Sequence, residues 1–383
     1  MSAALYIHIP YCLKKCAYCD FFSKKFLPEY SDIYLAAVMQ EMALNQNHPV
    51  FSATPVSTIY FGGGTPSVLP ARAIEAMLAR IHESFPTLQS GEITLEVNPE
   101  TVDLNYLQSL RSMGVNRLSI GVQSFSDIEL KLLGRIHDSD RAQQAIGRAR
   151  QAGFENLSLD LIFALPGQSL SSWQANLDRA VTFSPEHLSI YCLTVEPGTA
   201  LHRRIHSGKL HKASEEMERA MYLTSIERLS AQGYRQYEIS NFARPGQECR
   251  HNKKYWDGSP YLGLGPSAHS FWQATRQWNV ADVPKYFALI EQGVRPVDGA
   301  EILTREQQQF ECIMLSLRTT DGVDLPEFKR RFGIEFESAY KTTIETLRAD
   351  APTPLFRLDP QHFSLTPEGL VLYDEICSRF VTP

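Results

Sequence analysis

Short apolar runs that end at turn-forming residues recur through the first half of the chain. Each run is rich in β-branched and aromatic side chains and is followed by Gly, Pro, Asn or Ser, which is the pattern of a buried strand. Six runs fit this description: residues 5–9, 57–61, 92–97, 117–122, 156–163 and 187–192.

Segments of helical length separate these runs. Residues 71–85, 104–113 and 171–181 carry apolar side chains at the i, i+3, i+4 spacing of an amphipathic helix, and residues 127–153 have room for one or two more helices. Strand and helix in regular alternation predict parallel strands joined by crossovers. The expected fold class is α/β, as a partial (β/α)6 barrel; a doubly wound sheet is the less favoured alternative.

The pattern changes in the second half of the chain. We expect a helix at residues 214–232, a final strand and loop at 233–246, and a connector at 284–299. From residue 303 onward the pattern predicts three helices (306–317, 325–332 and 336–347), then a short hairpin and a closing helix.

This order resembles a small α+β, winged-helix-like module. Because a shared fold does not carry function, we expect this module to contact the barrel and to bind no nucleic acid. The predicted domains are therefore a barrel at 1–240, a barrel-edge extension and connector at 241–300, and the C-terminal module at 301–383.

Composition narrows the class of protein. The chain has 383 residues and a net charge of -6, so it offers no broad basic field for nucleic acid. No apolar run approaches the roughly 18 residues of a membrane span, and too few residues precede the first strand for a signal peptide. Four of the seven cysteines are scattered, which is a poor disulfide framework. These features predict a cytoplasmic protein.

The other three cysteines are clustered. Cys12, Cys16 and Cys19 follow the first strand with the spacing C-x3-C-x2-C. In a reducing compartment such a cluster indicates metal ligands or redox groups. Zinc with His8 as a fourth ligand is one alternative. Iron and sulfide is the favoured one: three thiolates would hold three irons of a cubane and leave the fourth iron open to a substrate or cofactor.

Other polar or unusual residues follow the strands in the same way. Three glycines at 62–64 follow the second strand, Glu96 ends the third, Gln123 follows the fourth, and Asp160 lies within the fifth. Each has a plain structural explanation, as a turn or a satisfied polar group. Their common position at the carboxyl ends of parallel strands, where such barrels carry their chemistry, predicts one site.

With these residues the chain resembles a known family, the radical S-adenosylmethionine (SAM) proteins. The resemblance rests on the cysteine spacing, with Tyr18 before the last cysteine, and on the GGGTP run at residues 62–66. It implies a [4Fe–4S] cluster on the three thiolates, SAM on the open iron, and an electron donor such as flavodoxin or ferredoxin. The SAM-site residues it implies are Tyr6, Gly63, Gly64, Thr65, Glu96, Gln123, Arg135 and Asp160, with the backbone around Tyr18 beside the adenine.

Longer runs narrow the resemblance to one subgroup. "LYIHIPYC", "GGGTPS", "GVQSF", "LGRIH" and "DLIFALPGQ" resemble the oxygen-independent coproporphyrinogen III oxidases and the HemW-type haem chaperones. Phe21 stands where the oxidases have a fourth cysteine, only four residues precede Leu5 where they have an extension, and "HNKKYW" at residues 251–256 resembles the H-N-x-x-Y-W signature of the chaperones.

All three features favour the chaperone branch. It implies haem as a ligand and haem-acceptor proteins, such as respiratory haem enzymes, as partners, with membrane association only through the acceptor. The alternatives are an oxidase that decarboxylates coproporphyrinogen propionates and a radical enzyme for another substrate. Whether SAM is turned over, so that the protein is an enzyme, and whether it forms a homodimer stay open.

His251 is the candidate haem ligand. A neutral imidazole can bind haem iron, and Tyr255 and Trp256 beside it offer flat apolar surface for a porphyrin face. We expect this motif to begin in a loop; an ordinary surface histidine is the alternative. His269 is a second candidate, which we place at the rim of the SAM site.

Overall fold

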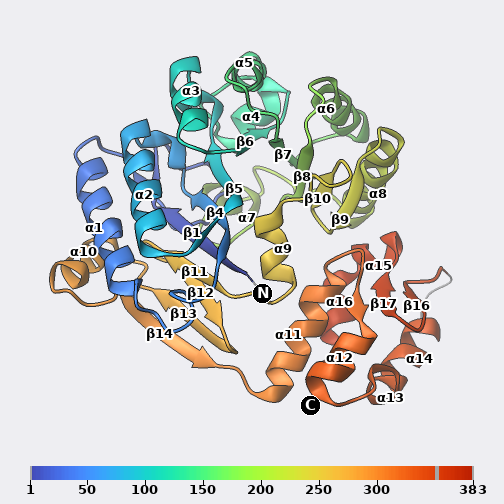
Figure 1. Cartoon of the computed structure of the whole chain (residues 1–383). Helices are drawn as coiled ribbons and strands as arrows, with labels where there is room; N and C mark the ends of the chain where they lie inside the picture. Colours follow the sequence, from blue (N-terminus) through green and yellow to red (C-terminus); the bar gives the residue numbers. More distant parts are fainter. Residues whose placement is uncertain (1, 350–352, 382–383) are drawn as a thin grey trace.

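A computed structural model describes residues 2–349 and 353–381 (Figure 1). Its main feature is one twelve-stranded sheet in the order β14-β13-β12-β11-β1-β4-β5-β6-β7-β8-β10-β9, with six consecutive parallel strands at its centre. These are β1 (Ala3–Ile9), β4 (Val56–Gly63), β5 (Thr87–Val97), β6 (Arg117–Gln123), β7 (Leu157–Phe163) and β8 (His187–Cys192). Each predicted run overlaps one of them.

Helices form an outer layer around the strands, as Figure 1 shows along the arc from α1 to α8. They are α1 (Tyr30–Asn45), α2 (Ala71–Ser84), α3 (Leu104–Ser112), α4 (Asp127–Leu133), α5 (Ser139–Gln151), α6 (Leu170–Thr182) and α8 (Glu215–Ala231), with single 3-10 turns η1 (Pro66–Val68) and η2 (Pro99–Thr101). The short helix α7 (Ala200–His206) lies inside this arc. The sheet has two free ends and does not close, so the predicted partial α/β barrel is confirmed.

The helical pattern explains why this layer forms. The buried side chains of α2 include Ile74, Met77, Leu78 and Ile81, which lie three or four residues apart and therefore on one face. Burying each such side chain stabilises the fold by about 1.5–3 kcal/mol. Trp173 of α6 is fully buried, and its indole N–H donates to Ser225 Oγ of α8 at 2.9 Å.

Additional strands extend the parallel core at both ends. Next to β1 lies β11 (Tyr261–Leu264), which is parallel to it, followed by β12 (His269–Trp272), β13 (Thr275–Asn279) and β14 (Val297–Ile302) in antiparallel order. Next to β8 lies β10 (Asn241–Ala243), followed by β9 (Arg235–Glu238).

Two local predictions for these segments are wrong. Residues 233–246 form two strands rather than one, and the predicted connector at 284–299 holds most of α10 (Val283–Glu291) and the start of β14. Both segments gain their structure from pairing or packing against distant parts of the chain, which local composition does not show. The domain limits at residues 240 and 300 stay predictions.

The last part of the chain is a small α+β domain, as predicted. Its elements are α11 (Arg305–Leu317), β15 (Val323–Asp324), α12 (Leu325–Phe332), α13 (Phe336–Ala339), α14 (Lys341–Ala349), β16 (Phe356–Leu358), β17 (His362–Leu365), α15 (Pro367–Val371) and α16 (Tyr373–Ser378). The three strands form a sheet in the order β15-β17-β16. Phe328, Phe336, Phe363 and Phe380 are buried together at its centre.

Across residues 2–349 and 353–381, none of the helices is both long enough and apolar enough to cross a membrane.

Candidate functional site

The three clustered cysteines lie on one loop. It begins at β2 (Tyr11–Cys12) and ends at β3 (Lys24–Lys25), and the two short strands pair with each other. The Ala17 amide donates to the Leu133 carbonyl at 2.9 Å, and the Leu201 amide donates to the Ala17 carbonyl at 2.7 Å. Gly134 has φ +77°, and a Cβ there would lie 3.1 Å from the Ala17 nitrogen. Glycine therefore lets the end of α4 approach the cysteine loop closely.

This loop forms one wall of a cavity of about 510 Å³ at the carboxyl ends of the parallel strands. The structure brings most of the predicted site residues together there: Cys12, Cys16, Tyr18, Cys19, Gly63, Gly64, Thr65, Glu96, Gln123, Arg135 and Asp160. Tyr6 and His251 do not line it, and neither does His269, which the sequence analysis placed at its rim. The roles assigned to these residues stay predictions.

Hydrogen-bond donors are aimed at two of the cysteine sulfurs. Thr65 Oγ1 donates to Cys12 Sγ at 3.5 Å, and Arg135 Nη1 donates to Cys16 Sγ at 3.4 Å. Burial raises the pKa of the Cys12 thiol and raises that of Cys19 to about 11. Iron binding would therefore release protons from these thiols, and the two donors would then stabilise the thiolate charge.

His8 does not face the cysteines as a zinc ligand would. Its Nδ1 is 3.0 Å from the Tyr6 hydroxyl, and its Nε2 is 3.0 Å from the Phe22 carbonyl oxygen, so both ring nitrogens have partners. In the part of the chain that the structure describes, no three His, Cys, Asp or Glu side chains converge closely enough to hold a single metal ion. A cubane cluster does not require the three thiolates to meet at one ion, because each thiolate binds a different iron.

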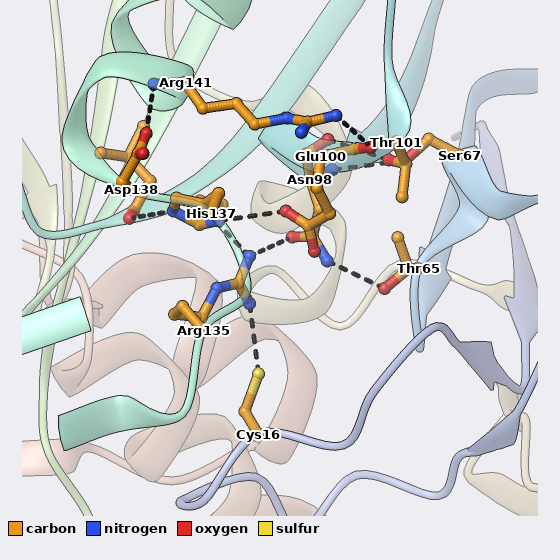
Figure 2. Close-up of polar contacts among 12 residues, drawn as sticks. Cys16, Thr65, Ser67, Asn98, Glu100, Thr101, Arg135, His137, Asp138 and Arg141 are labelled. Carbon is orange, nitrogen blue, oxygen red and sulfur yellow. Dashed lines mark hydrogen bonds and ion pairs between the residues drawn. The ribbon is translucent and has the colours of Figure 1, made fainter. Parts of the chain in front are cut away.

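Figure 2 shows how Arg135 is held in the cavity wall. Its Nη2 donates to Asn98 Oδ1 at 2.6 Å and to the Gly121 carbonyl at 3.1 Å, while Asn98 Nδ2 donates to Thr65 Oγ1 at 3.0 Å. Asn98 thus joins Arg135 to the glycine turn, a role that the sequence analysis missed. Its position directly after the third strand, like that of Gln123 after the fourth, is the signal that could have found it.

Two partly buried carboxyl groups face the same space. Glu96 accepts a hydrogen bond from the Tyr60 hydroxyl at 2.8 Å, yet burial raises its pKa to about 7. Both oxygens of Asp160 accept from Ser119 Oγ at 3.0 Å, and burial raises the pKa of Asp160 as well. These carboxylates have lost hydrogen bonds that water would supply at an exposed site. A ligand with an ammonium group or hydroxyl donors would replace those hydrogen bonds.

Two amides of the glycine turn donate to the backbone at the start of the cysteine loop. The Gly64 amide donates to the Ile9 carbonyl at 2.8 Å, and the Thr65 amide donates to the Tyr11 carbonyl at 2.7 Å. A Cβ on Gly64 would lie 2.5 Å from the Tyr11 carbonyl oxygen. These two amides therefore bind the start of the cysteine loop, and glycine is needed because that backbone passes so close.

Gln123 lies in an unusual backbone conformation. Its φ is +68°, in the left-handed region that few side chains adopt, at the end of β6 where the pairing with β7 shifts register. Strained residues of this kind persist where the surrounding structure enforces them, and they concentrate at functional sites. Gln123 lines the cavity, and its role in the site stays a prediction.

His251 lies on a helix, not in a loop, so that prediction is wrong. Helix α9 (Arg250–Trp256) contains the whole motif, and the His251 ring is 1% exposed. Its Nδ1 is 2.9 Å from Thr58 Oγ1, its Nε2 is 3.0 Å from the Tyr255 hydroxyl, and its ring stacks on Tyr60 at 4.9 Å. Burial lowers the pKa of His251 to about 3, so the ring is neutral.

A distant carboxylate explains why this segment is helical. Glu92 of β5 accepts from the amides of Arg250 and His251, both at 3.0 Å, at the first turn of α9. These amides have no partner within a helix, and a negative charge there also favours the helix dipole. The sequence carries no local capping signal for this helix, because the cap comes from a strand about 160 residues earlier.

A partial parallel barrel that collects a C-x3-C-x2-C loop at the carboxyl ends of its strands defines the class of radical SAM proteins. Comparison with known proteins agrees: residues 6–180 match the Radical SAM superfamily, and residues 303–372 match the HemN C-terminal domain. The "Heme chaperone HemW" of Bacillus subtilis is 36% identical over 379 residues, which cover 98% of each chain. The protein of that name from Mycobacterium tuberculosis is 37% identical and covers 97% and 93%.

A solved structure is similar over the whole chain. Coproporphyrinogen III oxidase (HemN) from Escherichia coli, described as a radical SAM enzyme, has a TM-score of 0.87 and 28% identity and covers 100% of this chain and 90% of its own. This chain belongs to the HemW family of radical SAM proteins. Membership of the superfamily implies a [4Fe–4S] cluster and SAM as the groups for the cavity, and the thiols and carboxyls that line it suit both.

We predict that Cys12, Cys16 and Cys19 together hold one [4Fe–4S] cluster. Anaerobic reconstitution should load about four irons and four sulfides per chain. Replacing any one of the three by Ala should abolish loading, whereas Cys377→Ala, which removes a buried thiol of the C-terminal domain, should load normally. Iron and sulfide analysis with the visible spectrum is the measurement. Stoichiometric zinc in place of iron would contradict the prediction.

We predict that Glu96→Ala and Asp160→Ala weaken SAM binding and leave the cluster intact. Loss of one charge-assisted hydrogen bond should cost roughly 1.5–3 kcal/mol, about ten- to a hundredfold in affinity. Glu96→Gln keeps the shape of the side chain and isolates the effect of its charge. Titration of each reconstituted variant with SAM tests this, with the exposed Glu83→Ala as the control. Unchanged affinity in both variants would assign these carboxyls a structural role.

Proposed function

We propose that this protein is a haem chaperone, which binds haem and transfers it to haem-requiring proteins such as respiratory enzymes. The observation that carries the proposal is the near full-length similarity to relatives named heme chaperone HemW, which covers 98% of both chains in the Bacillus subtilis case. The presence of the HNKKYW run on a helix with a neutral histidine and two aromatic side chains supports it.

In this proposal the protein keeps its radical SAM cavity in addition to binding haem. When bound, the cluster supplies one-electron chemistry and SAM supplies a source of a 5′-deoxyadenosyl radical. Cys12, Cys16 and Cys19 would hold the iron, while Glu96 and Asp160 would accept hydrogen bonds from the cofactor. Arg135 would hold the Cys16 sulfur and, through Asn98, the glycine turn in place.

An oxygen-independent coproporphyrinogen III oxidase is the second candidate. The close likeness in fold to the Escherichia coli enzyme favours it. Against it, Phe21 occupies the position where the resemblance expects a fourth cysteine, and its ring is 63% exposed at the cysteine loop. A chemical step that depends on exact positioning loses rate steeply when part of a pocket changes.

An electron donor of the flavodoxin or ferredoxin type is part of the proposal. The cysteine loop and the short strand that follows it carry four exposed lysines, Lys14, Lys15, Lys24 and Lys25, although the chain as a whole is acidic. Local positive charge beside the cluster would attract an acidic carrier and speed its encounter.

The remaining partner proposals follow from the chaperone function. The acceptor would be a haem protein, and contact with a membrane would run through that acceptor in an otherwise cytoplasmic protein. Nucleic acid has no part in the proposal, and a homodimer stays an untested prediction.

We predict that the reconstituted protein binds about one haem per chain and does not oxidise coproporphyrinogen. Haem titration by difference spectroscopy and an anaerobic coproporphyrinogen assay on the same sample test the two candidates together. The positive control is a coproporphyrinogen III oxidase assayed in parallel. Robust conversion to protoporphyrinogen would favour the oxidase, and failure to bind haem would refute the chaperone proposal.

We predict that His251→Ala reduces haem binding while the cluster and SAM binding survive. The substitution removes the hydrogen bonds to Thr58 and Tyr255 and the stacking on Tyr60. Direct ligation of iron by His251 would require its ring to release one of those hydrogen bonds. Haem titration of the variant is the measurement, with the exposed His82→Ala as the matched control. Unaltered haem binding would exclude His251 from the haem site.

A further inference from the structure

A second and larger cavity lies outside the radical SAM site. It has a volume of about 1100 Å³ and lies between the edge of the barrel and the C-terminal domain. In Figure 1 helix α9 stands between these two parts, beside α11. Sites for small molecules and cofactors commonly occupy about 300–1,000 Å³ and often lie between domains, so this space can accept a large planar ligand.

The barrel side of this cavity, which we call the interdomain cleft, is aromatic. The residues that line it there include Tyr255, Trp256, Tyr261, Phe271 and Trp272. Tyr255 and Tyr261 meet edge to face with ring centroids 4.7 Å apart, and the ring of Tyr261 stacks with that of Phe271 at 6.2 Å. Such a wall buries a flat apolar ligand well.

The HNKKYW helix thus contributes to this cleft and not to the radical SAM cavity. Tyr255 and Trp256 line the cleft, whereas His251 lies behind them. His251 Nε2 is 3.0 Å from the Tyr255 hydroxyl and therefore helps to position that ring. The motif supplies the aromatic surface predicted for a porphyrin, but its histidine is turned away from the space.

A thiol faces the cleft from the other side. Cys312 of α11 lines it and is partly exposed, and Arg331 Nη1 donates to its sulfur at 3.6 Å. A cysteine thiolate is an established axial ligand of haem iron, and hydrogen bonds to the sulfur tune such sites.

The cleft is lined by four acidic residues, Asp257, Glu311, Asp324 and Glu327, and by two arginines, Arg276 and Arg331. Two of its acidic residues already have cationic partners: Glu311 accepts from Arg276 at 2.6 Å, and Glu327 accepts from Arg330 at 2.6 Å. The Arg331 guanidinium can then contact a carboxylate with the N–H groups that Cys312 does not use.

We propose that the interdomain cleft is the haem site of this protein and that Cys312 is the axial ligand of the iron. The proposal rests on the haem-binding function proposed above and replaces His251 as ligand with a residue 61 positions later in the chain. Coordination would join the Cys312 sulfur to ferric iron and release the thiol proton to solvent. The barrel aromatics would cover one part of the macrocycle, and Arg331 would pair with a propionate.

The test titrates ferric haem into the anaerobically reconstituted full chain. Cys312→Ser should lower the affinity for haem at least about tenfold. Losses of this size are usual when a residue that supports a metal site is replaced. The substitution should also remove the thiolate signature from the ferric electron paramagnetic resonance spectrum. The matched control Cys377→Ala should keep both. His251→Ala should weaken binding but retain the thiolate signature, because the ligand is intact.

A second measurement needs no variant. Bound haem should slow alkylation of Cys312 in the unmodified protein at least about tenfold, while the exposed Cys192 serves as the internal reference. Tight haem binding with an unprotected Cys312 and an unchanged spectrum in Cys312→Ser would overturn this inference and leave the chaperone function standing. Absence of haem binding in the unmodified protein would overturn both.

Discussion

Parallel pairing of the central strands is the constraint on which the rest of the molecule depends. In such a sheet the carboxyl ends of neighbouring strands meet at one rim, and the register decides which residues become neighbours. Here His8 pairs with Gly62, Glu96 with Ser119, and Asp160 with Ser189. Residues between Cys12 and Glu196 thus enclose one cavity, and the cysteine loop forms one of its walls.

The cavity places polar groups where water is scarce. The carboxyls of Glu96 and Asp160 have raised pKa values because burial disfavours their charged forms, although Tyr60 and Ser119 donate hydrogen bonds to them. Such groups oppose the stability of the folded chain unless a ligand or proton satisfies them. This cost is the physical reason for the prediction that the two carboxyls serve binding.

Helix α9 connects this cavity with the interdomain cleft through a short series of contacts. Glu96 accepts from Tyr60, the Tyr60 ring stacks on His251, and His251 contacts the Tyr255 hydroxyl, whose ring lines the cleft. The motif lines the cleft alone, and these contacts are its link to the radical SAM cavity. The buried histidine of the motif thus holds neighbouring side chains in position, while the aromatic residues of the motif face the interdomain cleft.

Local patterns were enough to predict the alternating strands and helices, the three clustered cysteines and most of the rim, because these depend on local periodicity and on the side of a parallel sheet where strands end. Other features could not be predicted in this way: β11 continues the sheet beside β1, Asn98 holds Arg135, and residues 250–256 form a helix. Each of these depends on a partner far away in the chain, such as Glu92 at the first turn of α9. The burial of His251 and the cleft that contains Cys312 also arise from packing between distant segments, which no local pattern records.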